Sequence, residues 1–273
     1  MNDLYAVFGN PLGHTKSPFI HGEFARQTAQ NLDYIAIEAS PGGFAASLDA
    51  FKILGGKGAN VTAPFKVEAF ALAGDRCQRA ELAGASNALK FEDGRIIAEN
   101  FDGVGLVADI RENLCTPLRG RRVLMLGAGG AARGAALPIL EAGPASLTII
   151  NRTVAKAHAL RERFSSFGDI VSGGYADLGA GDFDIVINAT SASLRGELPP
   201  ITERVFARAG LAYELAYGKG LTPFLKLAKR SSVDRLADGV GMLVEQAAAA
   251  FAWWRGIRPA TGPMIEKITV PLI

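Results

Sequence analysis

The sequence predicts an α/β protein of two domains, in which an N-terminal α/β domain with a mixed sheet is interrupted by an inserted second α/β domain. Apolar runs typical of strands alternate with helical patterns over the first hundred residues, and a hairpin signal lies near their end. A second alternation starts at residue 122 with a continuous apolar run and a glycine-rich turn. The closing helices are expected to return to the first domain. We therefore assign residues 1–101 and 239–273 to one domain and 102–238 to the other.

The composition argues against several classes of function. The chain has 273 residues, of which 49% are hydrophobic and 21% charged, and its net charge of +2 gives no reason to expect a nucleic acid or a membrane as partner. Cys77 and Cys115 are far apart, and the histidines are scattered, so neither a disulfide framework nor a metal site is expected. The N-terminus has no signal pattern and no apolar stretch is long enough to span a bilayer, which predicts a cytoplasmic protein.

Local patterns predict the elements of the first domain. Strands are expected at residues 5–8, 32–37 and 58–62, with a helix of apolar spacing three and four at residues 44–51. Ser17 is expected to cap a helix that has Pro18 in its first position, and Pro64 to open another. Asp93-Gly94 separates two apolar runs and predicts a β-hairpin.

Polar side chains follow these strands and the hairpin. The residues concerned are Thr15, Ser17, Thr62, Lys66, Asn87 and Asp102. Each has an ordinary explanation as a cap, a turn residue or a surface residue, and Asp102 in particular lies where a helix cap is expected. Ligands of open α/β sheets bind outside the carboxyl ends of the strands. Hydroxyls, an amide, an ammonium and a carboxylate at one sheet edge predict a pocket for a polyhydroxylated ligand.

A dinucleotide-binding motif opens the second domain. Residues 122–126 have the pattern of a buried parallel strand, and residues 127–133 match G-x-G-x-x-A at a strand-to-helix turn. The glycines permit a tight turn and a close approach of a pyrophosphate, and the helix N-terminus offers it free N–H groups. A further strand at residues 146–150 completes the spacing of a βαβ unit. These features predict a Rossmann domain.

The end of that further strand favours NADP over NAD. NAD sites place an acidic residue there, whereas this chain has Asn151, Arg152 and Thr153, followed by Lys156. These side chains can bind a 2′-phosphate, and no carboxylate repels it. Alternatively, Thr153 caps the next helix and the cations are solvated; the two interpretations are compatible.

The remaining elements of the second domain are expected from similar patterns. Strands are predicted at residues 183–187 and 211–215, and the polar loop 188–191 is suited to lining the cofactor. Thr222 is expected to cap a helix that begins with Pro223. Gln246, at the margin of the apolar stripe of a closing helix, could reach the pocket of the first domain.

Taken together, these motifs resemble the shikimate dehydrogenase family over essentially the whole chain. The matching segments are residues 9–11 with 14–18, 58–62 with 64–66, 85–87, 102–105, 127–132, 151–153, 188–191, 219–223 and 238–243. The resemblance implies an NADP-dependent oxidoreductase that interconverts 3-dehydroshikimate and shikimate, on the route to chorismate and the aromatic amino acids. It implies a small-molecule substrate, no metal, and a monomer or homodimer.

The resemblance also assigns roles to individual residues. Lys66 and Asp102 would form the catalytic pair, with Lys66 as the proton donor that Asp102 orients. The substrate-binding residues would be Thr15, Ser17 and Tyr217 at the carboxylate, Thr62, Asn87 and Gln246 at the ring hydroxyls, and Phe101 beside the pair. The cofactor-binding residues would be Gly127, Ala128, Gly129, Gly130, Ala131, Asn151, Arg152, Thr153, Lys156, Ala189, Thr190, Ser191, Leu215, Gly239 and Met242.

Three positions differ from the residues usual in that family. Thr15 replaces a serine, and Ala88 and Phe101 each replace a threonine. The ring of Phe101 is expected to take up volume in the pocket, which predicts slow turnover of shikimate with a high KM. The competing possibility is that Phe101 points away from the pocket into the core and contributes packing only. Two alternatives remain open: a dehydrogenase for a related cyclitol acid such as quinate, and a catalytically weak NADP-binding sensor.

Overall fold

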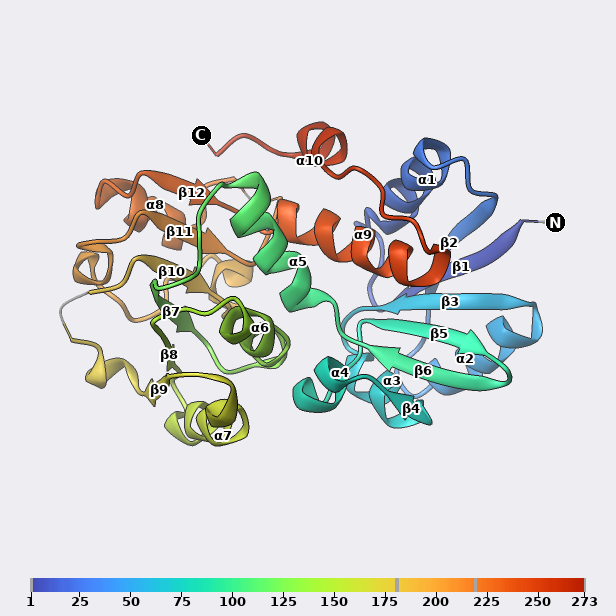
Figure 1. Cartoon of the computed structure of the whole chain (residues 1–273), viewed down its shortest axis with the longest axis horizontal. Coiled ribbons are helices and arrows are strands. Elements are labelled where there is room, and N and C mark those ends of the chain that lie inside the picture. The colour runs from blue at the N-terminus through green and yellow to red at the C-terminus, as the bar shows by residue number, and fades with distance from the viewer. Residues whose placement is uncertain (1, 180–181, 219, 273) are drawn as a thin grey trace. The chain divides into compact units, whose positions relative to one another are not determined.

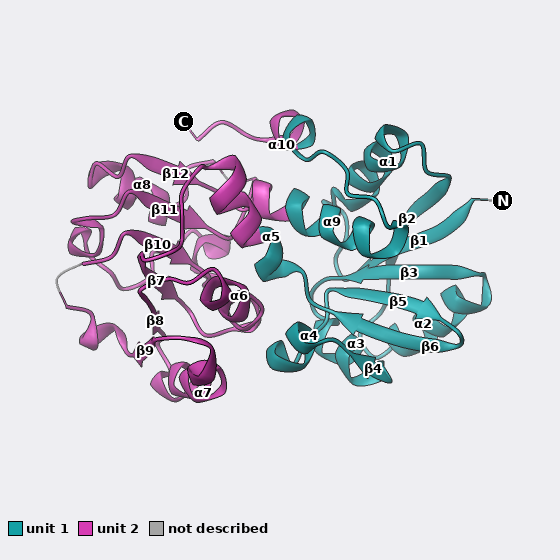
Figure 2. Cartoon of the chain, in the orientation of Figure 1, with its two compact units in different colours: residues 1–105, 244–264 teal, residues 106–243, 265–273 magenta. Residues whose placement is uncertain are grey.

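The chain folds into two compact units, which we describe from a computed structural model covering residues 2–179, 182–218 and 220–272 (Figure 1). Unit 1 comprises Met1–Gly105 and Val244–Met264, and unit 2 comprises Leu106–Leu243 and Ile265–Ile273 (Figure 2). Both inner boundaries fall inside helices, α5 (Asp102–Ala108) and α9 (Val240–Arg255). They lie a few residues beyond the expected positions, and the last residues join unit 2 rather than unit 1, because a helix that continues from one unit to the other leaves no linker signal in the sequence.

Unit 1 contains the expected mixed sheet. Its six strands have the order β2-β1-β3-β5-β6-β4, in which β1 is parallel to β2 and β3, and β5 is antiparallel to β3 and β6. The strands are β1 (Asp3–Gly9), β2 (Leu32–Glu38), β3 (Gly56–Val61), β4 (Asp75–Arg76), β5 (Ala88–Glu92) and β6 (Arg95–Glu99). The predicted hairpin is confirmed: Asp93 (φ 50°) and Gly94 (φ 74°) are both left-handed, as a two-residue type I′ turn requires.

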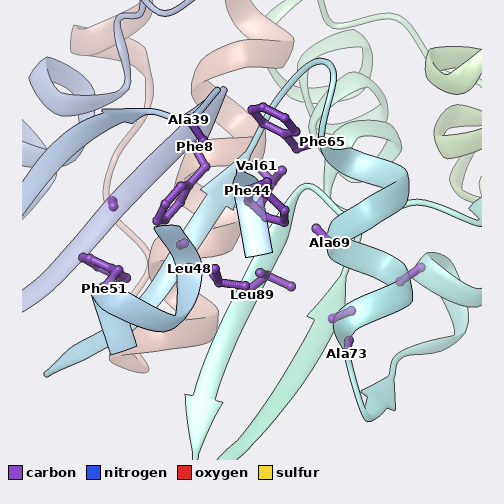
Figure 3. Close-up of a cluster of buried hydrophobic side chains, with 14 residues drawn as sticks. Phe8, Ala39, Phe44, Leu48, Phe51, Val61, Phe65, Ala69, Ala73 and Leu89 are labelled. Carbon is purple, nitrogen blue, oxygen red and sulfur yellow. The ribbon is translucent and has the colours of Figure 1, made fainter. Parts of the chain in front are cut away.

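The helices of unit 1 pack on this sheet around a core of phenylalanines. They are α1 (Ser17–Gln27), α2 (Phe44–Ile53), α3 (Lys66–Leu72), α4 (Gln78–Ala83) and parts of α5, α9 and α10 (Gly262–Ile268). Figure 3 shows Phe8 of β1 beside Phe44 and Phe51 of α2, with ring centroids 5.6 Å apart in each pair. Phe44 also stacks on Phe65 at 5.0 Å. Phe65 directly precedes α3, so this core reaches the turn from which α3 starts.

Two predicted helix starts in unit 1 are wrong. Helix α1 begins at Ser17 itself, with Lys16 as N-cap and no capping side chain. The Thr15 hydroxyl accepts the N–H of Ser17 at 3.3 Å, so Thr15 rather than Ser17 shapes the turn. Helix α3 begins at Lys66 and not at Pro64, because residues 63–65 form a turn in which the N–H of Phe65 donates to the carbonyl of Thr62 at 3.0 Å.

Unit 2 has the topology of a Rossmann domain. Its sheet is parallel and has the strand order β12-β11-β10-β7-β8-β9, the doubly wound order of dinucleotide-binding folds. The strands are β7 (Arg122–Leu126), β8 (Ser146–Ile150), β9 (Ile170–Gly173), β10 (Ile185–Asn188), β11 (Leu211–Glu214) and β12 (Arg235–Ala237). Strand β10 starts two residues later than predicted. The chain order reverses between β7 and β10, so a ligand is expected outside the carboxyl ends of these strands.

Helices cover this sheet (Figure 1). The longer helices are α6 (Gly130–Glu141), α7 (Val154–Phe164) and α8 (Pro223–Arg230). A π-helix spans Asp109–Asn113, and 3-10 helices span Ser165–Phe167, Tyr175–Asp177, Ala192–Arg195 and Glu203–Phe206. Thr222 caps α8 as predicted, since its hydroxyl accepts the N–H of Leu225 at 3.3 Å. Across residues 2–179, 182–218 and 220–272, no helix has the length and apolar character needed to cross a membrane.

Candidate active site

A lysine and an aspartate from the first residues of two helices form the centre of the candidate site in unit 1. Lys66 begins α3 and Asp102 begins α5, and Lys66 Nζ donates to Asp102 Oδ2 at 2.6 Å. The lysine side chain is 32% exposed and that of the aspartate 11%. A charged pair with one member open to solvent and the other largely buried is suited to proton transfer.

Asp102 is not the helix cap that its position suggested. It is the first residue of α5, and its own N–H donates to Asn100 Oδ1 at 3.1 Å. Its two carboxylate oxygens instead accept from side chains, Oδ2 from Lys66 and Oδ1 from Asn87 at 2.7 Å. The carboxylate is therefore held in one orientation from both sides.

Asn87 joins the predicted substrate-binding residues into one network. Its Nδ2 donates to Asp102 Oδ1 and to Gln246 Oε1 at 3.1 Å, and its Oδ1 accepts the N–H of Phe101 at 2.8 Å. Because Asn87 is 3% exposed and donates and accepts at opposite ends, its amide has a single orientation. Lys66, Asn87, Asp102 and Gln246 thus lie together, and we call them the Asp102 cluster.

The hydroxyl residues of unit 1 lie on the loops that leave β1 and β3. Thr15 Oγ1 donates to Ser17 Oγ at 3.4 Å, and within the described chain these two side chains bond to each other rather than to the Asp102 cluster. The loops pack closely: a Cβ on Gly9 would lie 2.4 Å from the methyl of Thr62, so this position requires glycine. Tyr217 belongs to unit 2 and is 41% exposed.

The ring of Phe101 lies in an apolar cluster. It is 6% exposed and packs with Ala88 and with Ala249 and Ala250 of α9, and its centroid lies 5.7 Å from that of Trp253 in an edge-on contact. Only the main chain of Phe101 joins the Asp102 cluster, through its bond to Asn87. Ala88 and Phe101, the two apolar residues that stand where the resemblance leads one to expect threonines, therefore pack in the same cluster.

The glycine loop of unit 2 has the geometry that a pyrophosphate needs. Gly127 has φ +107°, and a Cβ there would lie 3.0 Å from the carbonyl oxygen of Ala189. A Cβ on Gly129, the N-cap of α6, would meet no atom within 4 Å. Gly129 therefore borders open space at the start of α6, where helix N–H groups are available to phosphates.

The end of β8 presents cations beside this loop. Asn151 Oδ1 accepts the N–H of Ala128 at 3.1 Å, and its Nδ2 donates to the carbonyl of Thr153 at 2.9 Å, so Asn151 braces the glycine loop. Thr153 is the N-cap of α7 by position but makes no capping bond with its side chain. Arg152, Thr153 and Lys156 are exposed and can bind a phosphate.

The other predicted cofactor residues of unit 2 follow β10, β11 and β12. Ala189 and Thr190 lie against Gly127. A Cβ on Gly239 would lie 2.2 Å from the carbonyl oxygen of Leu215, so Gly239 and Leu215 are adjacent. The N–H of Met242 donates to the buried hydroxyl of Tyr213 at 3.3 Å. Lys219, the first residue of the matching segment 219–223, lies outside the described residues.

Sequence reasoning missed a buried carboxylate at this edge of the sheet. Glu214 ends β11 and is completely buried. The available signal was an acidic residue inside the apolar run 211–215.

Across residues 2–179, 182–218 and 220–272, no group of His, Cys, Asp and Glu side chains could hold a metal ion.

Comparison with known families gives matches along most of the chain. Residues 7–89 match the family model of the shikimate dehydrogenase substrate binding domain, residues 109–196 that of shikimate / quinate 5-dehydrogenase, and residues 239–269 that of the shikimate 5′-dehydrogenase C-terminal domain. The three matches fall on both units.

Individual relatives match over nearly their full lengths. The chain is 55% identical to the shikimate dehydrogenase (NADP(+)) of Nitrosospira multiformis, covering 98% of each chain, and 51% identical to that of Dechloromonas aromatica, covering 100% of each. Among solved structures, an Ael1 enzyme from Pseudomonas putida is 61% identical, with a TM-score of 0.96 and full coverage of both chains. A shikimate 5-dehydrogenase from Thermus thermophilus, in complex with NADP(H) and shikimate, is 29% identical, with a TM-score of 0.85 and 97% of each chain covered. This chain therefore belongs to the shikimate dehydrogenase family.

Proposed function

We propose that this protein is an NADP-dependent shikimate dehydrogenase, which interconverts 3-dehydroshikimate and shikimate. The observation that carries the proposal is the Asp102 cluster, in which Lys66 Nζ lies 2.6 Å from Asp102 Oδ2. It stands in a chain that is 55% identical to an enzyme of that name. The cluster offers an ammonium, a carboxylate and two amides, which can bind a ring that carries a ketone and hydroxyls.

The residues of unit 2 fit NADP(H). Backbone at Gly127 and Gly129 would receive the pyrophosphate, and Arg152 with Thr153 and Lys156 would receive the 2′-phosphate. When bound, NADPH supplies the hydride that reduces the ring ketone. The described residues at the end of β8 include no carboxylate that would repel the 2′-phosphate.

The side chains of the Asp102 cluster provide the proton chemistry of this reduction. The ammonium of Lys66 would donate a proton to the ketone oxygen as charge builds on it, which yields the alcohol and leaves a neutral amine. Asp102 would hold that ammonium in place, and Asn87 holds Asp102 in turn. Lys66 would regain its proton from solvent, to which it is 32% exposed. In the oxidation direction the neutral amine would accept the proton of the shikimate hydroxyl.

Two alternatives to this function remain to be tested. The first is a dehydrogenase for a related cyclitol acid such as quinate, since the family model over residues 109–196 names quinate as well as shikimate. The fold also occurs in an enzyme with another substrate, a 5-ketofructose reductase of Gluconobacter, with a TM-score of 0.83 and 28% identity. A catalytically weak NADP-binding sensor is less well supported, because the Lys66–Asp102 pair is intact and the ring of Phe101 lies in the apolar cluster.

The decisive experiment is a steady-state assay of NADPH absorbance with purified protein. We expect turnover with shikimate and NADP(+), and a much lower kcat/KM with quinate or with NAD(+). A higher kcat/KM with quinate would move the assignment to a quinate dehydrogenase. Binding of NADPH without turnover of either acid, at high enzyme concentration, would indicate a sensor.

We also propose that the protein acts in the cytoplasm, where NADPH is supplied to biosynthetic enzymes, and that it is a monomer or a homodimer. Fractionation of cells tests the location. Sedimentation equilibrium of the purified chain, whose mass is 28.7 kDa, tests the oligomeric state.

A further inference from the structure

Glu214 is a completely buried carboxylate that accepts four hydrogen bonds. Its Oε2 accepts from the hydroxyl of Ser193, from Asn188 Nδ2 at 2.9 Å and from Thr222 Oγ1 at 3.1 Å. Its Oε1 accepts the N–H of Ala216 at 3.3 Å. Among the residues that the structure describes, no lysine, arginine or histidine pairs with it.

Such a group is costly to keep. Burial raises the pKa of Glu214, and hydrogen bonds from Ser193, Asn188, Ala216 and Thr222 oppose that rise. A buried charge without a countercharge is less favourable than a well-packed apolar side chain of similar size. A costly acid at the end of a strand, beside a predicted ligand site, indicates a role in that site rather than in packing.

One arm of the network runs from Glu214 to the loop after β10. Asn188 ends β10, and its bond to Glu214 fixes which end of its amide is the acceptor. That acceptor, Oδ1, receives the N–H of Thr190 at 3.1 Å and the hydroxyl of Thr190 at 2.7 Å. Thr190 and Ala189 lie directly against Gly127. The position of the loop after β10 therefore depends on Glu214 through Asn188.

The other arm holds the loop after β11. The hydroxyl of Thr222 donates to Glu214 while it accepts the N–H of Leu225, so the same residue caps α8. Ala216 binds Glu214 at the start of this loop. One carboxylate thus joins the loops after β10 and β11, both at the carboxyl edge of the sheet.

In a Rossmann domain each half of the sheet binds one mononucleotide, and β10 to β12 form the second half. The first half carries the glycine loop and the cations at the end of β8. We propose that Glu214 is a positioning residue, which fixes the loops after β10 and β11 in the arrangement that binds the nicotinamide half of NADP(H). This inference rests on the proposed function.

Glu214→Gln tests the inference with almost no change in shape. Both carboxylate oxygens act only as acceptors, whereas an amide has one acceptor and one donor end. In either orientation of the glutamine, its NH₂ group meets a donor, either at Ala216 or among Ser193, Asn188 and Thr222. Losing one net hydrogen bond of this kind corresponds to about tenfold in affinity.

The readouts are two dissociation constants on purified full-length protein. Adenosine 2′,5′-bisphosphate probes the adenosine half alone, and NADPH probes both halves. For Glu214→Gln we expect the Kd of NADPH to rise about tenfold and the Kd of the bisphosphate to stay within about twofold. Glu214→Asp keeps a carboxylate and should recover part of the NADPH affinity. Phe164→Leu serves as a control for lost stability, because this buried residue ends α7, which packs on β9 at the opposite edge of the sheet.

Equal weakening of both ligands by Glu214→Gln, or no weakening of either, would overturn the positioning role. Failure of the wild type to bind NADPH would instead overturn the proposed function. Should Glu214→Gln not fold, Ser193→Ala removes the hydroxyl that donates to Glu214 and that accepts from Asn188 Nδ2 at 3.2 Å, and we expect the same selective loss of NADPH affinity at about threefold. Unchanged NADPH affinity in Ser193→Ala, as in the Phe164→Leu control, would then count against the inference.

Discussion

Lys66 Nζ and Asp102 Oδ2 lie 2.6 Å apart, although their residues are separated by 36 positions in the sequence. Lys66 follows strand β3 and Asp102 follows strand β6. In the sheet, β5 lies between β3 and β6, and β5 and β6 form an antiparallel pair. Asn87 holds the other oxygen of the carboxylate, so the pair is placed before any substrate binds. Such an arrangement lowers the reorganisation needed for proton transfer.

Lys66→Ala should therefore reduce kcat by about a hundredfold or more, the usual loss when a general acid is removed, with a smaller change in the KM of shikimate. Because Lys66 and Asp102 act as a unit, the double variant Lys66→Ala/Asp102→Ala should be little worse than either single one. The exposed Lys57 provides the control variant Lys57→Ala, which should keep wild-type kinetics. Retention of most of kcat in Lys66→Ala would show that the proton comes from another group.

Arg152→Ala should weaken NADPH about tenfold while leaving NADH nearly unchanged. The exposed guanidinium at the end of β8 is predicted to bind only the 2′-phosphate, which NADH lacks. Titration of both dinucleotides by fluorescence gives the two dissociation constants. Arg161→Ala, exposed near the end of the following helix α7, is the matched loss of charge and should change neither dissociation constant. An equal loss for both dinucleotides in Arg152→Ala would contradict the assignment.

Phe101→Thr should lower the free energy of unfolding by about 3 kcal/mol, because it removes a buried ring and leaves a cavity beside Trp253. We expect kcat/KM for shikimate to stay flat or to fall, since the ring does not belong to the hydrogen-bond network of the Asp102 cluster. Thermal unfolding and steady-state kinetics on the same variant test this. A rise in kcat/KM at unchanged melting temperature would mean that Phe101 obstructs the pocket, and would explain slow turnover in the wild type.

His21 should make folding sensitive to acid. It is 1% exposed and stacks on Tyr34 with ring centroids 4.2 Å apart, and burial lowers its pKa to about 3 from an ordinary 6.5. Below pH 6.5 the unfolded chain binds a proton that the folded chain does not bind until about pH 3. The stability due to neutral His21 is thus complete above pH 6.5 and is lost as the pH falls toward 3, with a loss of about 2 kcal/mol between pH 7 and pH 5.

The matched variant is His21→Phe, which keeps a ring but cannot titrate. Urea unfolding at pH 7 and pH 5 should show that the wild type loses about 2 kcal/mol more than this variant over that interval. Other titrating groups are common to both proteins, so their effects cancel in the comparison. Parallel losses in the two proteins would mean that the folded chain takes up the His21 proton over the same pH range as the unfolded chain, so that burial does not lower its pKa.

Local features of this protein follow from its sequence alone. The glycine loop after β7, the hairpin at Asp93-Gly94 and the Thr222 cap each depend on residues within a few positions of one another, and all three are found where the sequence predicts them. The two-domain α/β architecture follows as well, because the period of apolar residues reports which faces of strands and helices are buried. The starts of α1 and α3 were misplaced, since hydrogen bonds in the preceding turns, and not the prolines, decide them.

Only the tertiary structure decided how side chains meet. A residue at the end of a strand can turn to either side, and which side it takes depends on strands and helices far away in the sequence. Asn87 finds Asp102 and Gln246 for that reason, and Phe101 turns into the cluster with Trp253 instead of joining them. Glu214 looked like one acid in an apolar run, and its role became visible only once Asn188, Ser193 and Thr222 converged on it. Such convergence is set by the order of strands in the sheet, which local patterns do not contain.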